Sequence, residues 1–165
     1  SAPLGTGMYK VGGNYAASLF ANNKAHEMGY ACEFYLDAKE KKYIDECGAA
    51  NFFGIKDGKY ITPKSTSILP SITNDSLMQV ARDLGMTVEQ RPIPVEEIAT
   101  FEEAGACGTA AVISPISYID DIETGKRYDF GPEPGPQSRL LYDTLVGIQY
   151  GEIEDKHGWS HVVIE

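Results

Sequence analysis

The spacing of apolar side chains along the chain predicts helices separated by strands. Two long segments carry apolar or small side chains at helical spacing and contain neither proline nor glycine. Each is followed by a glycine, Gly29 or Gly85, which favours termination of a helix. A third amphipathic pattern lies near the end of the chain. The expected helical segments are residues 14–28, 75–84, 95–99 and 137–150.

Strands are predicted where short apolar or β-branched runs lie between turn residues. The pair Asp57-Gly58 favours a two-residue hairpin, so the runs on either side of it are expected to pair. A second hairpin, on the surface, is expected over residues 118–130. The other predicted strands cover residues 32–36, 42–44, 51–55, 59–62, 87–93 and 110–114.

Strands mixed with helices in this order predict an α+β fold in a single domain, residues 1–165. A chain of 165 residues is long enough to bury one substantial core. Residues 131–136 are rich in glycine and proline. We interpret them as a stiff loop rather than a domain boundary, because too little chain follows them.

The acidic composition limits the classes of partner. The formal net charge is −10, whereas binding to nucleic acid or to an anionic membrane requires clustered Lys and Arg. No apolar run approaches the roughly 20 residues that cross a bilayer, and no charged-then-apolar leader opens the chain. We therefore expect a soluble protein with no nucleic-acid or membrane partner. A leader before residue 1 stays open.

The cysteines and histidines suggest no metal site. Cys32, Cys47 and Cys107 are odd in number, far apart in sequence and without a CxxC pair, which argues against a disulfide framework and a zinc site. The three histidines are scattered and lack spaced partners. Free thiols are typical of a reducing compartment, so the expected location is the cytoplasm and the expected metal content is none.

Lys10 carries the most suggestive chemistry in the chain. Glycines flank it on both sides, at Gly7 and at Gly12-Gly13, and glycine lets a backbone approach a ligand closely. A lysine held in a desolvated pocket becomes a nucleophile toward a carbonyl carbon. This pattern predicts an imine with an aldehyde cofactor, and an ordinary surface lysine in a turn is the alternative.

Further segments match one known family in its own order. Residues 43–53 resemble a strand that carries a cofactor-binding glutamate, and residues 68–76 resemble a phosphate-binding turn. Residues 105–112 are similar to a second phosphate and substrate loop. The end of the chain, residues 145–152 and Gly158-Trp159, resembles the family's closing helix and C-terminus. Together with the lysine segment, these residues resemble the branched-chain amino acid aminotransferases, which are fold type IV enzymes dependent on pyridoxal 5'-phosphate.

The resemblance implies a barrel-like mixed sheet with surrounding helices, and it implies that the chain is the large C-terminal domain only. Nine residues precede Lys10, where the family has a small N-terminal domain. By resemblance that domain supplies an arginine to the cofactor phosphate and aromatic residues to the substrate pocket. The chain alone is therefore expected to be inactive. Family members usually form homodimers, so a homodimer is expected.

The resemblance assigns roles to individual residues. Lys10 would bind the cofactor as an imine and move a proton between the substrate α-carbon and the C4′ atom. Glu46 would keep the pyridine nitrogen protonated. Its strand neighbour Asp45 points to the opposite face and is expected to be solvated. Tyr15 would hydrogen-bond the phenolic oxygen, with a core tyrosine as the alternative.

The phosphate contacts are expected at a helix start and a loop. Ile72 and Thr73 precede the helix predicted to begin at Asp75, where backbone amides can bind an anion. The alternative for Thr73 is a simple N-cap. Thr109 would add a hydroxyl to the phosphate, and the amide of Ala110 would meet the substrate carboxylate.

Four positions depart from the family pattern. Ser71 replaces a glycine common in relatives and Asn74 replaces an arginine, which alters the expected shape of the phosphate turn. Ala49 and Ala50 replace bulkier or hydroxylated residues. These two positions border the substrate side of the pocket, so preference for leucine, isoleucine and valine is less firmly implied than cofactor binding.

The predicted function is therefore transamination between branched-chain L-amino acids and 2-oxoglutarate by a ping-pong mechanism. Alternatives within the same fold type are a D-amino acid aminotransferase and an aminodeoxychorismate lyase. A different class of function is a non-catalytic domain that retains the fold and binds a partner or an anionic ligand. Lys10 and Glu46, each in its expected motif, favour the enzyme.

Overall fold

A tight hairpin forms the middle of the main sheet in the computed structural model, which describes residues 1–163. Strands β3 (Ala50–Lys56) and β4 (Lys59–Pro63) are joined by Asp57 and Gly58. Both turn residues have positive φ, 50° and 68°, the conformation that a two-residue hairpin requires. The hairpin predicted at this pair is confirmed.

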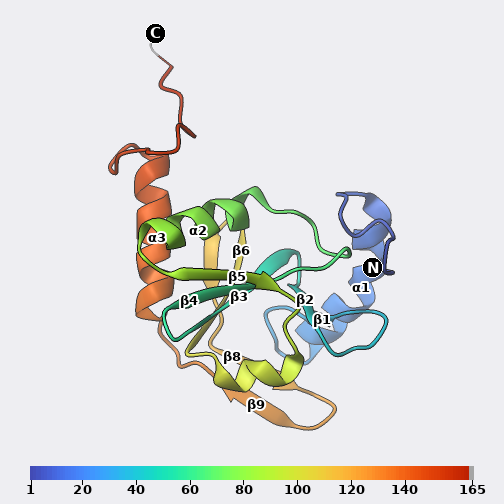
Figure 1. The fold of residues 1–165 in the computed structure, drawn as a ribbon. Helices are drawn as coiled ribbons and strands as arrows, with labels where there is room; N and C mark the ends of the chain where they lie inside the picture. The colour runs from blue at the N-terminus through green and yellow to red at the C-terminus, as the bar shows by residue number, and fades with distance from the viewer. Residues whose placement is uncertain (164–165) are drawn as a thin grey trace.

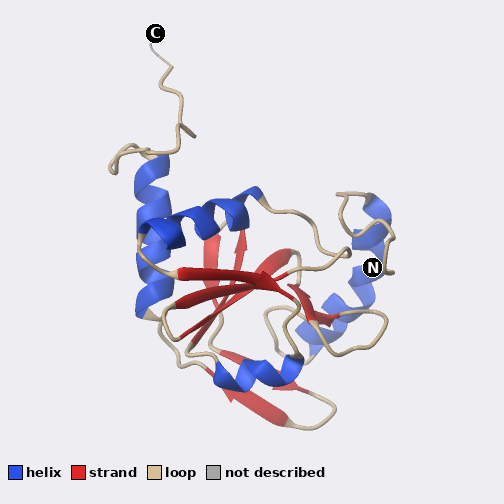
Figure 2. Ribbon diagram, viewed as in Figure 1, coloured by secondary structure: helices blue, strands red, loops and turns tan. Residues whose placement is uncertain are grey.

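Five further strands complete a seven-stranded mixed sheet (Figures 1 and 2). Strand β2 precedes the hairpin and pairs with β1 and β3, and β5 adds to β4 in parallel. Strand β6 pairs with β3 over Asn51–Ile55 and with β7. The bounds are β1 (Phe34–Leu36), β2 (Ile44–Cys47), β5 (Thr87–Arg91), β6 (Glu103–Gly108) and β7 (Val112–Pro115).

The chain after β5 returns to β2 and curls the sheet toward closure. The amide of Ile44 donates to the carbonyl of Ile93 at 2.9 Å, and the amide of Val95 donates to the carbonyl of Lys42 at 2.8 Å. Tyr43 and Pro94 form an isolated antiparallel bridge between these bonds. The prediction of an α+β fold with a barrel-like mixed sheet is confirmed.

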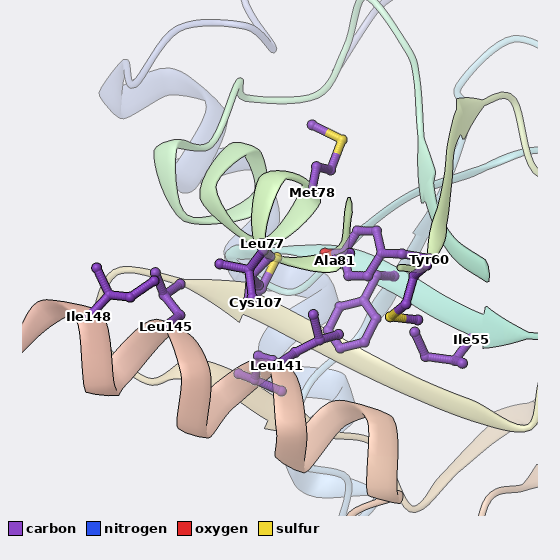
Figure 3. Packing of buried hydrophobic residues seen from close by; sticks show 13 residues of the cluster. Ile55, Tyr60, Leu77, Met78, Ala81, Cys107, Leu141, Leu145 and Ile148 are labelled. Atoms are coloured by element: carbon purple, nitrogen blue, oxygen red, sulfur yellow. The ribbon is translucent and has the colours of Figure 1, made fainter. Parts of the chain in front are cut away.

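Two helices cover one face of the sheet. Helices α2 (Ile72–Asp83) and α3 (Pro136–Gln149) pack against β3, β4, β6 and β7 around one hydrophobic core. Figure 3 shows Leu141 and Leu145 of α3 directed toward Leu77 of α2 and Cys107 of β6. Full burial of a leucine side chain contributes about 1.5–3 kcal/mol, so these contacts hold α2 firmly on the sheet.

A second core lies on the opposite side of β3. Phe52 and Ile61 pack there with Ile98 of the short 3₁₀ helix η1 (Val95–Thr100). The hairpin of β8 (Tyr118–Asp121) and β9 (Lys126–Asp129) borders this core through Ile119 and Tyr128. The surface hairpin and the short helical piece predicted from the sequence are both present.

Helix α1 (Gly12–Glu27) lies apart from α2 and α3 (Figure 1) and is less buried than its apolar side chains suggest. Ala25 is the buried residue of this helix, whereas Leu19 is 58% and Phe20 81% exposed. Asn22 nevertheless ties the helix to the start of β1 by donating to the Glu33 carboxylate at 2.9 Å. The sequence predicted the helix but not this exposed apolar surface.

Strand β6 was missed by the sequence analysis, and β7 begins two residues later than the strand predicted over residues 110–114. Glycines at both Gly105 and Gly108 disfavour a strand prediction. In the structure, Gly105 lies directly across from the Phe53 ring, which occupies the space that a Cβ would need. The glycine thus allows β6 to pair closely with β3.

Candidate functional site

Glu46 lies at the end of β2, beside the loop that leads into α2. It is the cross-strand partner of Asn51 in β3. The amide of Leu69 donates to Glu46 Oε1 at 3.1 Å, and Asn51 Nδ2 donates to the carbonyl of Leu69 at 3.0 Å. Two side chains from neighbouring strands therefore bind the amide and the carbonyl of one loop residue, Leu69, and fix the loop over the Glu46 carboxylate.

The Glu46 carboxylate is half-buried, and this burial raises its pKa. Desolvation raises its pKa to about 7, although the hydrogen bond from Leu69 opposes this shift. The charge of Asp45 raises the pKa further, and the N-terminal amino group lowers it. This half-buried carboxylate has one hydrogen bond, so a cationic partner would strongly stabilise its ionised form.

Asp45 does not have the solvated position that the strand alternation suggested. Its side chain is 6% exposed, and Oδ1 is buried with no hydrogen-bond partner among the described residues. Burial also raises the pKa of this carboxyl. The expectation was wrong because the loop after β4 lies against this face of β2, where Ser65 is close enough to lower the pKa of Asp45.

Helix α2 begins at Ile72, three residues earlier than the sequence predicted, and its N-cap is Ser71 rather than Thr73. Ser71 Oγ accepts from the amide of Asn74 at 3.1 Å, and the Ser71 carbonyl accepts from Asp75. The amides of Ile72 and Thr73 lie in the first turn, ahead of these bonds. They are left as donors at the positive end of the helix dipole, which is an anion-binding arrangement.

Asn74 anchors this helix start to the sheet through a buried network. Tyr60 donates its hydroxyl to Asn74 Oδ1 at 2.7 Å, and Asn74 Nδ2 donates to Thr62 Oγ1 at 3.2 Å. The Cys107 thiol also points at Asn74 Oδ1, with a separation of 3.7 Å. The departure from arginine at this position therefore replaces a long cation with a side chain that fixes the helix on β4 and β6.

Thr109 and Ala110 lie in the turn between β6 and β7. Gly108 and Val112 pair across this turn, which leaves the three residues between them exposed. The neighbouring pair Cys107 and Asn51 joins β6 to the strand that contacts the Leu69 loop. Because Asn74 of α2 also contacts Cys107, the turn and the first amides of α2 lie at the same end of the sheet.

The segment that contains Lys10 lies against the same loop. Gly7 is buried directly on the backbone of Ser67, with no room for a Cβ. Asn14 organises the turn before Lys10, because its Nδ2 donates to the carbonyls of Thr6 at 2.8 Å and Tyr9 at 2.9 Å. The N-terminal amino group lies near enough to Asp45 and Glu46 to lower the pKa of both.

The structure brings some predicted site residues together and leaves others apart. Glu46, the start of α2 and the Thr109 turn gather at one end of the sheet. Lys10 and Tyr15 are exposed, and within residues 1–163 neither side chain hydrogen-bonds to Glu46. Two supporting residues escaped the sequence analysis, Asn14 and Asn51. The signal for Asn51 is its polar amide inside an otherwise apolar strand, where asparagine is disfavoured.

The described part of the chain shows neither a metal cluster nor a membrane-spanning helix. No group of three or more His, Cys, Asp and Glu side chains in residues 1–163 is placed to hold a metal ion. None of the helices in the same residues combines the length and the apolar character needed to cross a membrane.

The raised pKa of Glu46 predicts a specific dependence of stability on pH. The folded protein binds this proton more tightly than the unfolded chain, whose ordinary glutamate pKa is 4.5. The contribution of Glu46 to the free energy of unfolding is therefore largest below pH 4.5 and falls as pH rises toward about 7. We expect the Glu46→Gln variant to lose this decline, measured by urea unfolding without added cofactor between pH 4.5 and 8. Parallel curves for the two proteins would contradict the assignment.

The chain is similar to a known protein family and to curated proteins over most of its length. The family model described as amino-transferase class IV matches residues 5–119. The branched-chain-amino-acid aminotransferase of Haemophilus influenzae is 51% identical over 166 residues, which cover 96% of this chain and 48% of that protein. The enzyme of the same name from Helicobacter pylori is 52% identical over 161 residues, covering 96% of this chain and 46% of that protein.

Solved structures show the same relationship. The branched-chain amino acid aminotransferase of Escherichia coli superposes with a TM-score of 0.85 at 33% identity, covering 96% of this chain and 51% of that chain. A T.th. enzyme of the same name, solved with pyridoxamine 5'-phosphate, gives a TM-score of 0.81 at 30% identity and covers 93% of this chain and 48% of that chain. This chain thus spans about half the length of the relatives that it matches.

Proposed function

This chain belongs to the class IV aminotransferases, and on that premise we propose that it is the cofactor-binding half of a branched-chain L-amino acid aminotransferase dependent on pyridoxal 5'-phosphate. Relatives named branched-chain-amino-acid aminotransferase align with 96% of this chain. The aligned part is about half of their own length. A small domain in the other half would complete the pocket. The reaction would exchange an amino group between leucine, isoleucine or valine and 2-oxoglutarate.

The observation that carries this proposal is the position of Glu46 beside the start of α2. The two ends of a phosphorylated pyridine need opposite partners, a carboxylate for the ring nitrogen and several donors for the phosphate. Glu46 offers a half-buried carboxylate with one hydrogen bond. Ile72 and Thr73 offer backbone amides at the helix start, and the Leu69 loop links the two. These residues fit the cofactor.

Pyridoxal 5'-phosphate, when bound, supplies an aldehyde that condenses with amines and a ring that accepts electrons from the substrate α-carbon. Glu46 holds a proton on the ring nitrogen, which favours that electron flow. The amides of Ile72 and Thr73, with the hydroxyl of Thr109, hold the phosphate. Lys10 would carry a proton on its Nζ to and from the reacting carbon atoms, and Tyr15 would orient the ring through a hydrogen bond to the phenolic oxygen.

The turn between β2 and β3 bears on the choice of substrate. Gly48 and Ala49 join Cys47 to Ala50, directly after Glu46, and Ala49 is exposed. By the resemblance, Ala49 and Ala50 border the substrate side of the pocket, where small side chains would leave room for a branched apolar group. The amide of Ala110, in the exposed turn after β6, would bind the substrate carboxylate.

The assembled enzyme is proposed to be a cytoplasmic homodimer without nucleic-acid or membrane partners. The net charge of −10 supports the exclusion of polyanionic partners. The apolar side chains of Leu4, Tyr9, Leu19 and Phe20 are 58–86% exposed on this chain. A second subunit and the small domain would cover them.

Covalent trapping tests the function. We expect borohydride reduction of the full-length enzyme with pyridoxal 5'-phosphate to attach the pyridoxyl group to Lys10, located by peptide mapping. Lys39→Ala is the matched control, because Lys39 is an exposed lysine in the turn before β2 and its loss should leave the labelling unchanged. Labelling scattered over surface lysines would overturn the proposal.

The same sample distinguishes the related activities. Leucine, isoleucine or valine should bleach the cofactor absorbance before 2-oxoglutarate is added, since the 2-oxo acid product leaves first in a ping-pong reaction. Bleaching by D-alanine alone would indicate a D-amino acid aminotransferase. Release of pyruvate from aminodeoxychorismate would indicate a lyase, and a folded enzyme that fails to take up cofactor would indicate a non-catalytic domain.

A further inference from the structure

Cys32 and Cys47 meet in the fold although 15 residues separate them in the sequence. Their Sγ atoms are 3.3 Å apart. The antiparallel pairing of Phe34 with Cys47 aligns β1 with β2, and the amide of Gly48 donates to the carbonyl of Glu33 at 2.8 Å. The pairing of β1 with β2 thus brings together two cysteines that are far apart in sequence.

The backbone at Gly48 permits this approach. Gly48 has a φ of +56°, and a Cβ on it would lie 3.2 Å from the Cβ of Cys32. A larger residue would be strained and would push the Cys32 segment away from β2. The contact between the two thiols is thus held by backbone geometry rather than by the side chains alone.

One thiol of the pair, Cys32, is accessible, whereas Cys107 is not. Cys32 is exposed, and Cys47 and Cys107 are buried. A cavity of about 560 Å³ between α1, β1 and β8 has both Cys32 and Cys47 in its wall. Cys107 instead contacts Asn74 in the buried network beneath α2. A small polar oxidant can therefore reach Cys32 without unfolding the protein.

The two thiols differ in acidity. The hydrogen bond with Cys47 lowers the pKa of Cys32 to about 7, against the opposing effects of burial and of the Glu33 charge. The same bond, together with burial, raises the pKa of Cys47. Cys32 is thus the more acidic thiol of the pair and Cys47 is its thiol partner, which is the arrangement of an attacking and a resolving cysteine.

We propose that Cys32 and Cys47 form a redox-active dithiol that hydrogen peroxide converts to an intramolecular disulfide. The Cys32 thiolate attacks peroxide, the O–O bond breaks, and Cys32 becomes a sulfenic acid as the leaving hydroxide takes a proton to form water. The Cys47 sulfur then attacks the Cys32 sulfur, an S–S bond forms, the S–O bond breaks, and the Cys47 proton leaves with the hydroxide as a second water. The two sulfurs lose two electrons in total, and peroxide gains them.

The proposal does not depend on the transaminase assignment, because it uses neither Lys10 nor the phosphate site. It places a reversible covalent link one residue from Glu46. The sulfurs need to approach each other by only about 1.2 Å to reach the 2.05 Å bond length of a disulfide, starting from 3.3 Å. Closing the bond would fix β1 to the strand that carries the carboxylate.

Peptide mapping of the full-length protein tests the proposal. After treatment with dilute peroxide and blocking of free thiols, trypsin places Cys32 in the peptide 25–39 and Cys47 in the peptide 43–56. We expect these two peptides to be joined, with the joined species lost after dithiothreitol. Cys107→Ser is the matched control, and it should leave the joined species unchanged.

Two variants make the interpretation unambiguous. In Cys47→Ser the Cys32 sulfenic acid has no resolving thiol, so we expect it to be captured by dimedone on the peptide 25–39. Cys32→Ser, at an exposed position, should leave Cys47 unreactive toward peroxide in a protein with unchanged circular dichroism. Over-oxidation of Cys32 with Cys47 still free in the unmutated protein, or a link only between separate molecules, would overturn the proposal.

Discussion

Lys10→Ala in the full-length enzyme is expected to lower the rate of transamination by about 10³-fold or more. Proton transfer by a positioned side chain contributes roughly 10²–10⁴-fold, and Lys10 has a second task in holding the cofactor. The measurement is formation of the 2-oxo acid from leucine under saturating cofactor and 2-oxoglutarate. The fall should appear in kcat, because Ile72, Thr73 and Glu46 still hold the cofactor in the variant.

Chemical rescue separates a catalytic role of Lys10 from a structural one. A small free amine such as methylamine can carry the missing proton, so the rate of Lys10→Ala should rise in proportion to its concentration. Lys39→Ala should keep its activity and show no response to the amine. An unrescued loss that accompanies altered circular dichroism, or activity within tenfold of the original, would remove Lys10 from the mechanism.

The sequence predicted which segments form helices and strands more reliably than where each begins and which segments contact it. Helix α2 was predicted from the spacing that starts at Leu77, so its true start at Ile72 was missed: Ile72 is 83% exposed and does not continue the apolar face. The capping bond of Ser71 with the Asn74 amide decides the start. This correction strengthens the anion site, because it moves Ile72 and Thr73 into the first turn.

Errors about individual residues came from contacts between distant segments. The alternation rule placed Asp45 and Glu46 on opposite faces of β2, but it could not show that the loop containing Ser65 covers the Asp45 face as well. The approach of Cys32 to Cys47 likewise depends on the pairing of β1 with β2. Periodicity along the chain carries no information about such pairings.

The exposed face of α1 is a different kind of departure. Apolar and small side chains predicted a helix over residues 14–28, and the helix is present, but Leu19 and Phe20 are largely exposed in this chain. Lys10 precedes α1 directly, and its turn is organised by Asn14 at the start of the helix. On the proposed function, contacts that cover α1 in the full-length protein would also fix the direction of Lys10.

Glu46→Gln is expected to lower kcat for transamination on the order of 10²-fold, the magnitude found when one preorganised electrostatic partner is removed from an active site. Glutamine has nearly the same shape and can still accept a hydrogen bond from the Leu69 amide, so the loop over the site should keep its position. It cannot balance a proton on the ring nitrogen, so the electron flow that the ring supports is weakened. The KM for leucine should change little, since Glu46 acts on the cofactor.

Asp45→Asn provides the matched control for this effect. Asp45 is the preceding residue of the same strand, is buried, and is also a carboxylate with a raised pKa, but it lies on the other face of β2. A general loss of negative charge near the site would lower activity in both variants, whereas a specific partnership with the ring nitrogen lowers it only in Glu46→Gln. The Glu46 carboxylate ionises with a pKa of about 7, so uptake of cofactor by the unmutated enzyme should strengthen from pH 6 to 8, and this rise should be absent in Glu46→Gln. Equal activity losses in the two variants, with matching pH profiles for cofactor uptake, would show that Glu46 does not face the cofactor.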